Sequence, residues 1–119
     1  MTKLDINKVY YLSHPLTSCG TMKENYEHEE KCAIQIRLLE INNCESNEFY
    51  HLIRPLEILP PSFDTHKAMD RCIKLLRACD SIIMCGNWRH SNGCLTEMDY
   101  AKRYGLEIIY YENLIKEQL

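Results

Sequence analysis

The fold of this chain is decided by the stretch Ser81-Ile82-Ile83-Met84-Cys85-Gly86-Asn87-Trp88-Arg89-His90-Ser91-Asn92-Gly93. Its first five residues form a continuous apolar run, the pattern of a strand that is covered on both faces of a parallel sheet. Residues 86–92 are polar and predict a loop, and residues 93–104 predict a helix that Gly105 ends at the C-cap position. The stretch therefore predicts a buried strand that leads through a polar loop into a helix.

Strands and helices also alternate on both sides of this unit. β-rich runs predict strands at residues 9–13, 49–53 and 107–111. Helical spacing predicts helices at residues 22–43, from Asp64 or Thr65 to Cys79, and at residues 113–119. Residues 56–64 predict an irregular loop. Such alternation produces right-handed βαβ units. We expect an α/β fold, one three-layer domain over residues 1–119, whose four- or five-stranded parallel sheet has the order 2-1-3-4.

Length and charge exclude several classes of protein. The 119 residues carry 14 basic and 17 acidic side chains, a net charge of −3, which argues against a general nucleic-acid binder because such binders need a basic excess. No apolar run approaches the roughly 18 residues of a membrane span, and the first residues lack the apolar core of a signal peptide. We expect a soluble, cytoplasmic protein.

The seven cysteines give no sign of a metal or disulfide site. They are scattered, their number is odd, and no two stand in a C-x-x-C spacing. His28 and Cys32 are the only His/Cys pair on a plausible helical face, and two ligands without a third do not make a metal site. We expect buried free thiols, no metal and no cofactor.

Glu97 is the strongest candidate for chemistry. Ligands of parallel α/β sheets bind at the carboxyl ends of the strands, which directs attention to the loops at residues 14–21, 54–64 and 86–92. Glu97 falls in the first or second turn of the helix that follows the last of these loops, where the helix dipole favours an ionised carboxylate, a potential nucleophile. The alternative is that Glu97 only supports the helix start, and Ser91 or Asn92 can likewise be a plain N-cap.

Trp88 is the only tryptophan and lies in the polar loop. It can stack on a planar ligand such as a nucleobase, or it can be a hydrophobic lid over the helix ends. Arg89 and His90 can bind a phosphate or face solvent. Tyr10 and Tyr11 alternate faces on the first strand, so one hydroxyl is expected near the ligand and the other in the packing.

Several motifs together resemble a known family. They are Tyr11-Leu12-Ser13-His14-Pro15, Asn25 near the start of a long helix, Arg54-Pro55, Asp70 with Cys79-Asp80, and Trp88-x-x-Ser91-x-Gly93-x-x-x-Glu97-x-x-x-Ala101-x-x-x-Gly105. Over about residues 9–111 the chain resembles the nucleoside 2-deoxyribosyltransferase-like superfamily, and within it the small DUF4406-type branch that is common in phages and prophages. The segment from Trp88 to Gly105 is the specific part of this resemblance.

The resemblance implies a flavodoxin-like (Rossmann-like) sheet and roles for particular residues. Glu97 stands at the position of the nucleophile, Tyr11 at that of the tyrosine that hydrogen-bonds it, and Asp70 where a second functional carboxylate is often found, while Asp80 is expected to be structural. The substrate-binding residues expected from the motifs are Ser13, His14, Pro15, Asn25, Gly86, Trp88, Ser91 and Gly93.

The chain departs from the family pattern at two of these positions. Ser91 stands where the classical transferases have an aspartate that protonates the leaving base. His14 replaces the usual glycine before the proline, which can narrow the pocket.

The favoured function is cleavage of an N-glycosidic bond. The transition state resembles an oxocarbenium ion, which a carboxylate beneath the anomeric carbon can stabilise or trap covalently. The ligand is then a nucleoside or nucleotide, and both transfer and hydrolysis fit. The alternative is a non-catalytic protein that sequesters a nucleotide or a nucleotide-derived signal, and a structural or interaction protein is a third possibility. The resemblance also implies a homo-oligomer.

Overall fold

A four-stranded parallel sheet forms the centre of the computed structural model, which describes residues 4–5, 7–43, 51–58 and 65–118. Its strands are β1 (Val9–Ser13), β2 (His51–Ile53), β3 (Ser81–Met84) and β4 (Glu107–Tyr110), in the order β2-β1-β3-β4. This confirms the predicted α/β class and the order 2-1-3-4. The register pairs Ser13 with Met84, so β1 and β3 end together at the centre of the sheet.

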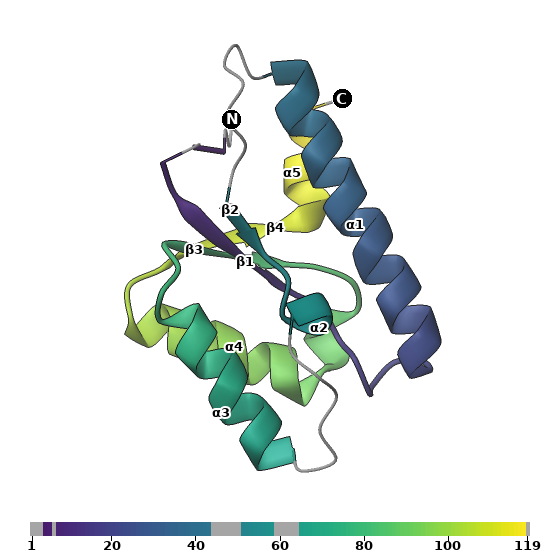
Figure 1. Cartoon of the computed structure of the whole chain (residues 1–119), viewed down its shortest axis with the longest axis vertical. Coiled ribbons are helices and arrows are strands. Elements are labelled where there is room, and N and C mark those ends of the chain that lie inside the picture. The colour runs from purple at the N-terminus through teal and green to yellow at the C-terminus, as the bar shows by residue number, and fades with distance from the viewer. Residues whose placement is uncertain (1–3, 6, 44–50, 59–64, 119) are drawn as a thin grey trace.

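Helices cover both faces of the sheet (Figure 1). On one side lie α1 (Met22–Asn43) and α5 (Tyr111–Gln118), and on the other lie α3 (Thr65–Leu76) and α4 (Asn92–Arg103). Because side chains alternate along a strand, β1 sends Tyr10 and Leu12 into the first layer and Tyr11 into the second. All four residues of β3 are buried, as its continuous apolar run predicts.

Two short helices occupy segments that the sequence predicts as loops. Helix α2 (Pro55–Ile58) replaces the first part of the expected irregular loop, because proline suits the first turn of a helix and the carbonyl of Arg54 accepts bonds from the amides of Glu57 and Ile58. The 3₁₀-helix η1 (Trp88–His90) lies within the expected polar loop.

Other boundaries shift by a few residues. Helix α3 ends at Leu76 rather than Cys79, α4 begins at Asn92, and α5 begins directly after β4. The amides of Ala78 and Cys79 bond to carbonyls three residues back, which closes α3 with a tight turn. The predicted strand residues 49–50 and loop residues 59–64 lie outside the described ranges. Within those ranges, no helix is long and apolar enough to cross a membrane.

A buried ion pair joins α1 to the segment that follows β2. The carboxylate of Glu29 is fully buried and receives bonds from Nε of Arg54 at 3.1 and 3.2 Å and from its terminal nitrogen at 2.6 Å. Arg54 also reaches Glu57 of α2 at 2.5 Å. This two-pronged pairing holds α1 and α2 together beside the carboxyl end of β2.

Replacing Arg54 by alanine is expected to destabilise the protein strongly. The change leaves the Glu29 carboxylate buried without a partner, which costs about 3–5 kcal/mol. Urea unfolding at pH 7 measures the loss. As a control, Asp99→Asn breaks the exposed pair with Arg103 and should change the unfolding free energy by less than about 1 kcal/mol. Similar small losses in both variants would contradict a structural role for the Glu29–Arg54 pair.

Candidate active site

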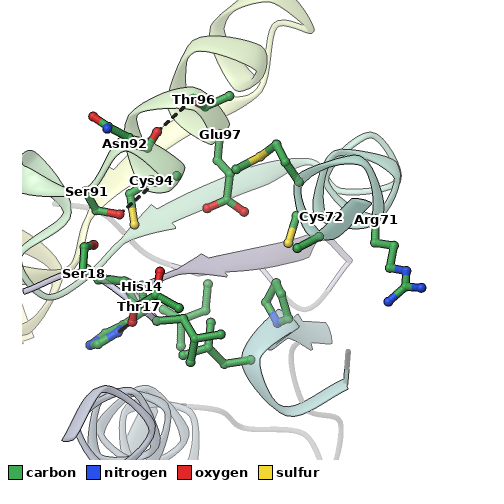
Figure 2. A pocket seen from close by; sticks show the side chains of 18 of the residues that line it. His14, Thr17, Ser18, Arg71, Cys72, Ser91, Asn92, Cys94, Thr96 and Glu97 are labelled. Atoms are coloured by element: carbon green, nitrogen blue, oxygen red, sulfur yellow. Dashed lines mark hydrogen bonds between the residues drawn. The ribbon is translucent and has the colours of Figure 1, made fainter. Parts of the chain in front are cut away.

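A pocket of about 640 Å³ opens at the carboxyl ends of β1 and β3. Its wall is formed by the segment after β1, by α2, by one side of α3 and by the start of α4 (Figure 2). Much of the lining is apolar, including Leu12, Pro15, Leu56 and Met69. Small-molecule sites typically enclose about 300–1,000 Å³ and combine apolar walls with a few polar groups, so this pocket has the size and lining of such a site.

The carboxylate of Glu97 points into this pocket (Figure 2), and side chains of β1 form hydrogen bonds with it. The hydroxyl of Tyr11 donates a hydrogen bond to Oε2, and the hydroxyl of Ser13 donates one to Oε1 at 2.8 Å. Tyr11 and Ser13 are two residues apart, so both side chains leave the same face of the strand. Each oxygen of Glu97 therefore has its own hydroxyl donor.

The start of α4 fixes where Glu97 lies. Ser91 caps the helix by accepting a bond from the amide of Cys94 at 3.3 Å, and it also lines the pocket. Cys94, Glu97 and Ala101 are three and four residues apart, so they share the buried face of the helix. Glu97 is thus carried to the sheet by the same face that packs α4 onto the core.

The described residues pair no cation with the carboxylate of Glu97. Among the described residues no ion pair reaches its carboxylate, and Arg71, at the edge of the pocket, points away from it (Figure 2). Burial raises the pKa of Glu97 from 4.5 to about 7, while the hydrogen bonds from Tyr11 and Ser13 oppose the rise. The ionised form is therefore poorly stabilised and would gain from a positive charge on a ligand.

His14 forms a fixed part of the pocket wall. Its Nδ1 lies 2.7 Å from the carbonyl of Pro15 and must donate to it, so Nε2 accepts from Nδ1 of His28 at 2.8 Å. Burial lowers the pKa of His14, which favours the neutral ring. Gly86 has a φ of +68°, and a Cβ at this position would lie 2.8 Å from Nε2 of His14. Gly86 thus provides both the backbone conformation and the space that His14 needs.

Asn25 shapes the segment that lines the pocket after His14. Its side-chain amide donates to the carbonyls of Leu16 and Ser18 at 2.7 and 3.0 Å. Leu16 and Ser18 both line the pocket. Asn25 is therefore placed behind the wall, where it holds the backbone of the loop.

The structure brings most of the expected site residues together. Glu97, His14, Pro15, Ser91 and Gly93 line the pocket. Tyr11 and Ser13 lie behind Glu97, and Asn25 and Gly86 support the wall.

Trp88 is not part of the pocket wall. Its indole is 6% exposed, stacks on Tyr110 with ring centroids 5.5 Å apart, and lies under the guanidinium of Arg89 at 4.3 Å. This differs from the expectation that Trp88 faces a base, because η1 turns the ring into the core and leaves His90 on the pocket side. The placement matches the alternative, a hydrophobic lid over the helix ends.

Asp70 is not brought to the pocket either. The side of α3 that lines it carries Ala68, Met69 and Cys72, whereas Asp70 is exposed and absent from the lining among the described residues. Two lining thiols, Cys72 and Cys94, were expected only as buried core residues. The helical spacing of Met69 with Cys72 was the available signal, because the apolar side of α3 continues past the core into the pocket.

The chain matches the family model described as "Domain of unknown function (DUF4406)" over residues 8–110. No curated protein matches it. Among solved structures, it is similar to one titled "2-desoxiribosyltransferase from Leishmania mexicana", with a TM-score of 0.51 and 16% sequence identity. The match covers 87% of this chain and 63% of that one, so this chain spans less than two thirds of the other's length. This similarity confirms the expected deoxyribosyltransferase-like fold.

Glu97→Gln is expected to make the protein more stable at alkaline pH. Because the pKa of Glu97 is about 7 in the folded protein against 4.5 ordinarily, the folded state keeps a proton that the unfolded chain loses between these values. The unfolding free energy of the wild type therefore falls as the pH rises from 4.5 to 7, by about 3 kcal/mol at most. Glutamine cannot ionise, so the unfolding free energy of the variant does not fall with pH for this reason.

Urea unfolding at pH 5 and pH 8 measures this effect. The variant should be more stable than the wild type at pH 8 by on the order of 1–3 kcal/mol, with a smaller difference at pH 5. The exposed Glu27→Gln serves as the matched control and should stay within about 0.5 kcal/mol at both pH values. A Glu97→Gln variant that is less stable at pH 8 would show that the carboxylate is not destabilised by burial.

Proposed function

The chain belongs to the DUF4406 family, and we propose that it cleaves the N-glycosidic bond of a nucleoside or nucleotide with Glu97 as the nucleophile. The observation that carries the proposal is a buried carboxylate at the pocket wall that has two hydroxyl donors and, among the described residues, no cation. The fold it shares with a protein titled a 2-desoxiribosyltransferase supports the same class of substrate.

The electrostatics of the pocket suit this reaction. Breaking an N-glycosidic bond places positive charge on the sugar ring in the transition state. Burial leaves an ionised Glu97 poorly stabilised by the surrounding protein, so its energy falls most when that charge develops beside it. Binding energy is then gained in the transition state rather than in the ground state, which is the condition for catalysis.

The reaction proceeds in two steps. An oxygen of Glu97 bonds to C1′ of the sugar while the C1′–N bond breaks, and the electron pair leaves with the base, which takes up a proton. Water or a nitrogen of a second base then bonds to C1′, the ester to Glu97 breaks, and the acceptor releases a proton. Water gives hydrolysis and a second base gives transfer.

The proton for the leaving base has few sources in the described part of the pocket. Glu97 is the only carboxyl group among the described lining residues, and His14 already uses both ring nitrogens. His66 and His90 also line the pocket, and histidine is the side chain that most often transfers protons in active sites. We assign the proton to one of these histidines or to a residue from a second copy in a homo-oligomer, which light scattering on the purified protein would detect.

Product analysis tests the proposed function. The protein is incubated with deoxynucleosides and their monophosphates, with and without free base, and products are separated by chromatography. Release of base indicates hydrolysis, and exchange of base indicates transfer. Tight binding without either product would instead favour a sequestering protein.

Kinetics of Glu97→Gln test the nucleophile. The variant should keep its fold and lose several orders of magnitude in rate, because the amide cannot attack C1′. A 2-fluorinated deoxynucleoside should add the mass of one sugar to the wild-type peptide that contains Glu97. Equal turnover by the wild type and the Glu97→Gln variant would falsify the assignment.

The rate of the wild type should depend on pH with a defined sign. Attack requires the ionised carboxylate, so kcat/KM should be low at pH 5, rise through a midpoint near pH 7 and then level off. A rate that instead falls as the pH rises through 7 would show that protonated Glu97 acts as an acid.

A further inference from the structure

The contact between His14 and His28 joins the pocket wall to α1. Nε2 of the buried His14 lies 2.8 Å from Nδ1 of the exposed His28, and the ring centroids are 5.0 Å apart. The two nitrogens therefore face each other between the rings. His14 lines the pocket, whereas His28 does not. His28 thus acts on the pocket through His14.

There is room for one hydrogen atom between the two nitrogens. Nδ1 of His14 donates its N–H to the carbonyl of Pro15 at 2.7 Å, so Nε2 has a lone pair that accepts from Nδ1 of His28. A proton taken up on the far nitrogen of His28 leaves this contact intact. When both rings are cations, an N–H group stands on each side of the 2.8 Å gap, and the contact must break.

The backbone holds the His14 ring on its other sides. A Cβ at Gly86, which follows the buried Cys85, would lie 2.8 Å from Nε2 of His14, so this backbone packs directly against the ring. The carbonyl of Pro15 holds Nδ1. His28 supplies the donor for Nε2, and its loss would leave a buried acceptor without a partner. The place of the ring in the wall therefore depends on a side chain outside the pocket.

Titratable groups lie near the pair on several elements. On α1, Glu24 and Lys31 lie one turn before and after His28, and Sγ of Cys32 is 3.9 Å from its Nδ1. The titratable residues that share the pocket lining with His14 are His66, Arg71, Cys72, His90, Cys94 and Glu97.

These surroundings do not favour two charges on the pair. Among the described residues, no ion pair joins either ring to a carboxylate. Burial lowers the pKa of His14 and the charge of His28 lowers it further, while the bond to Pro15 opposes the change. Geometry and charge therefore both disfavour a pair of cations.

We propose that His28 is a positioning residue, which holds the ring of His14 in the pocket wall through one shared hydrogen atom and releases it when both rings are protonated. Asn25 and Glu29 lie on the same face of α1 and bond to the segments after β1 and β2. His28 adds a third polar contact to this face, and that contact is sensitive to acid. The effect on substrate rests on the proposed function, whereas the contact itself does not.

Two substitutions of His28 separate the hydrogen bond from packing. In His28→Asn, the amide nitrogen takes the place of Nδ1 and donates to Nε2 of His14, and after rotation the amide oxygen accepts from a protonated His14. This variant should keep the contact at neutral and at acid pH, the wild type at neutral pH alone, and His28→Ala at neither. The matched control, His51→Asn, replaces an exposed histidine of β2 and should behave as the wild type.

NMR of ¹⁵N-histidine-labelled protein measures how firmly the ring is held. The Nδ1–H proton of His14, bonded to Pro15, is visible only while the fixed ring protects it from exchange with water, and His14→Gln assigns its signal. In the wild type the signal should be present at about pH 7.5 and lost below about pH 5. It should survive at both pH values in His28→Asn and be lost at both in His28→Ala.

Turnover adds an independent readout. If the protein is active, His28→Ala should raise KM by roughly threefold or more at neutral pH with little change in kcat, and His28→Asn should restore the wild-type KM. If no nucleoside or nucleotide is turned over, the proposed function fails while the NMR signal still tests the pair. A signal that survives in His28→Ala, that persists in the wild type in acid, or that is lost in both variants alike would overturn the role of His28.

Discussion

The carboxylate of Glu97 is buried at the junction of β1 and α4, and the arrangement of the site follows from how that charge is held. Two hydroxyls from one face of β1 meet its two oxygens, which requires Tyr11 and Ser13 to be two residues apart on a straight strand. It also requires Ser91 to cap α4, which begins at Asn92, so that the buried face of the helix brings Glu97 to the end of the sheet. The site thus depends on the pairing of β1 with β3 and on one helix cap.

A second buried glutamate shows what Glu97 lacks. Glu29 is fully buried on α1, but the guanidinium of Arg54 meets both of its oxygens and balances its charge. That pairing suits a structural role, because the buried charge of Glu29 is already balanced by Arg54. Among the described residues, Glu97 has only the neutral donors Tyr11 and Ser13, and burial raises its pKa. In one small domain, the presence or absence of a cation distinguishes a glutamate that holds helices together from one available for chemistry.

Sequence patterns predicted the sheet and its helices well, since apolar runs and helical spacing depend on local burial. The order of the strands followed from the buried character of β3 and from the handedness of βαβ units. The placement of Trp88 could not be predicted from the sequence, because a lone aromatic side chain in a polar loop can turn toward a ligand or toward the core. The turn of η1 decides between these two positions. The position of Asp70 away from the pocket wall was hard to predict for a related reason: one residue along α3 rotates a side chain by about 100°, which separates Asp70 from Met69 at the wall. Helix α2 was missed because it is only four residues long, too short for a helical spacing of apolar residues to show.

The neutral surroundings of Glu97 also bear on whether the protein is an enzyme or a binding protein. A nucleotide carries negative charge, so an unbalanced carboxylate beside it weakens binding in the ground state. A protein that only sequesters such a ligand would be better served by an amide at this position, whose oxygen accepts a hydrogen bond without bringing a charge. A carboxylate becomes an advantage only when the ligand develops positive charge, as a sugar does when its bond to the base breaks. Two hydroxyls on the carboxylate, in place of an arginine, leave that charge available to the sugar. The environment of Glu97, more than its identity, therefore favours catalysis over sequestration.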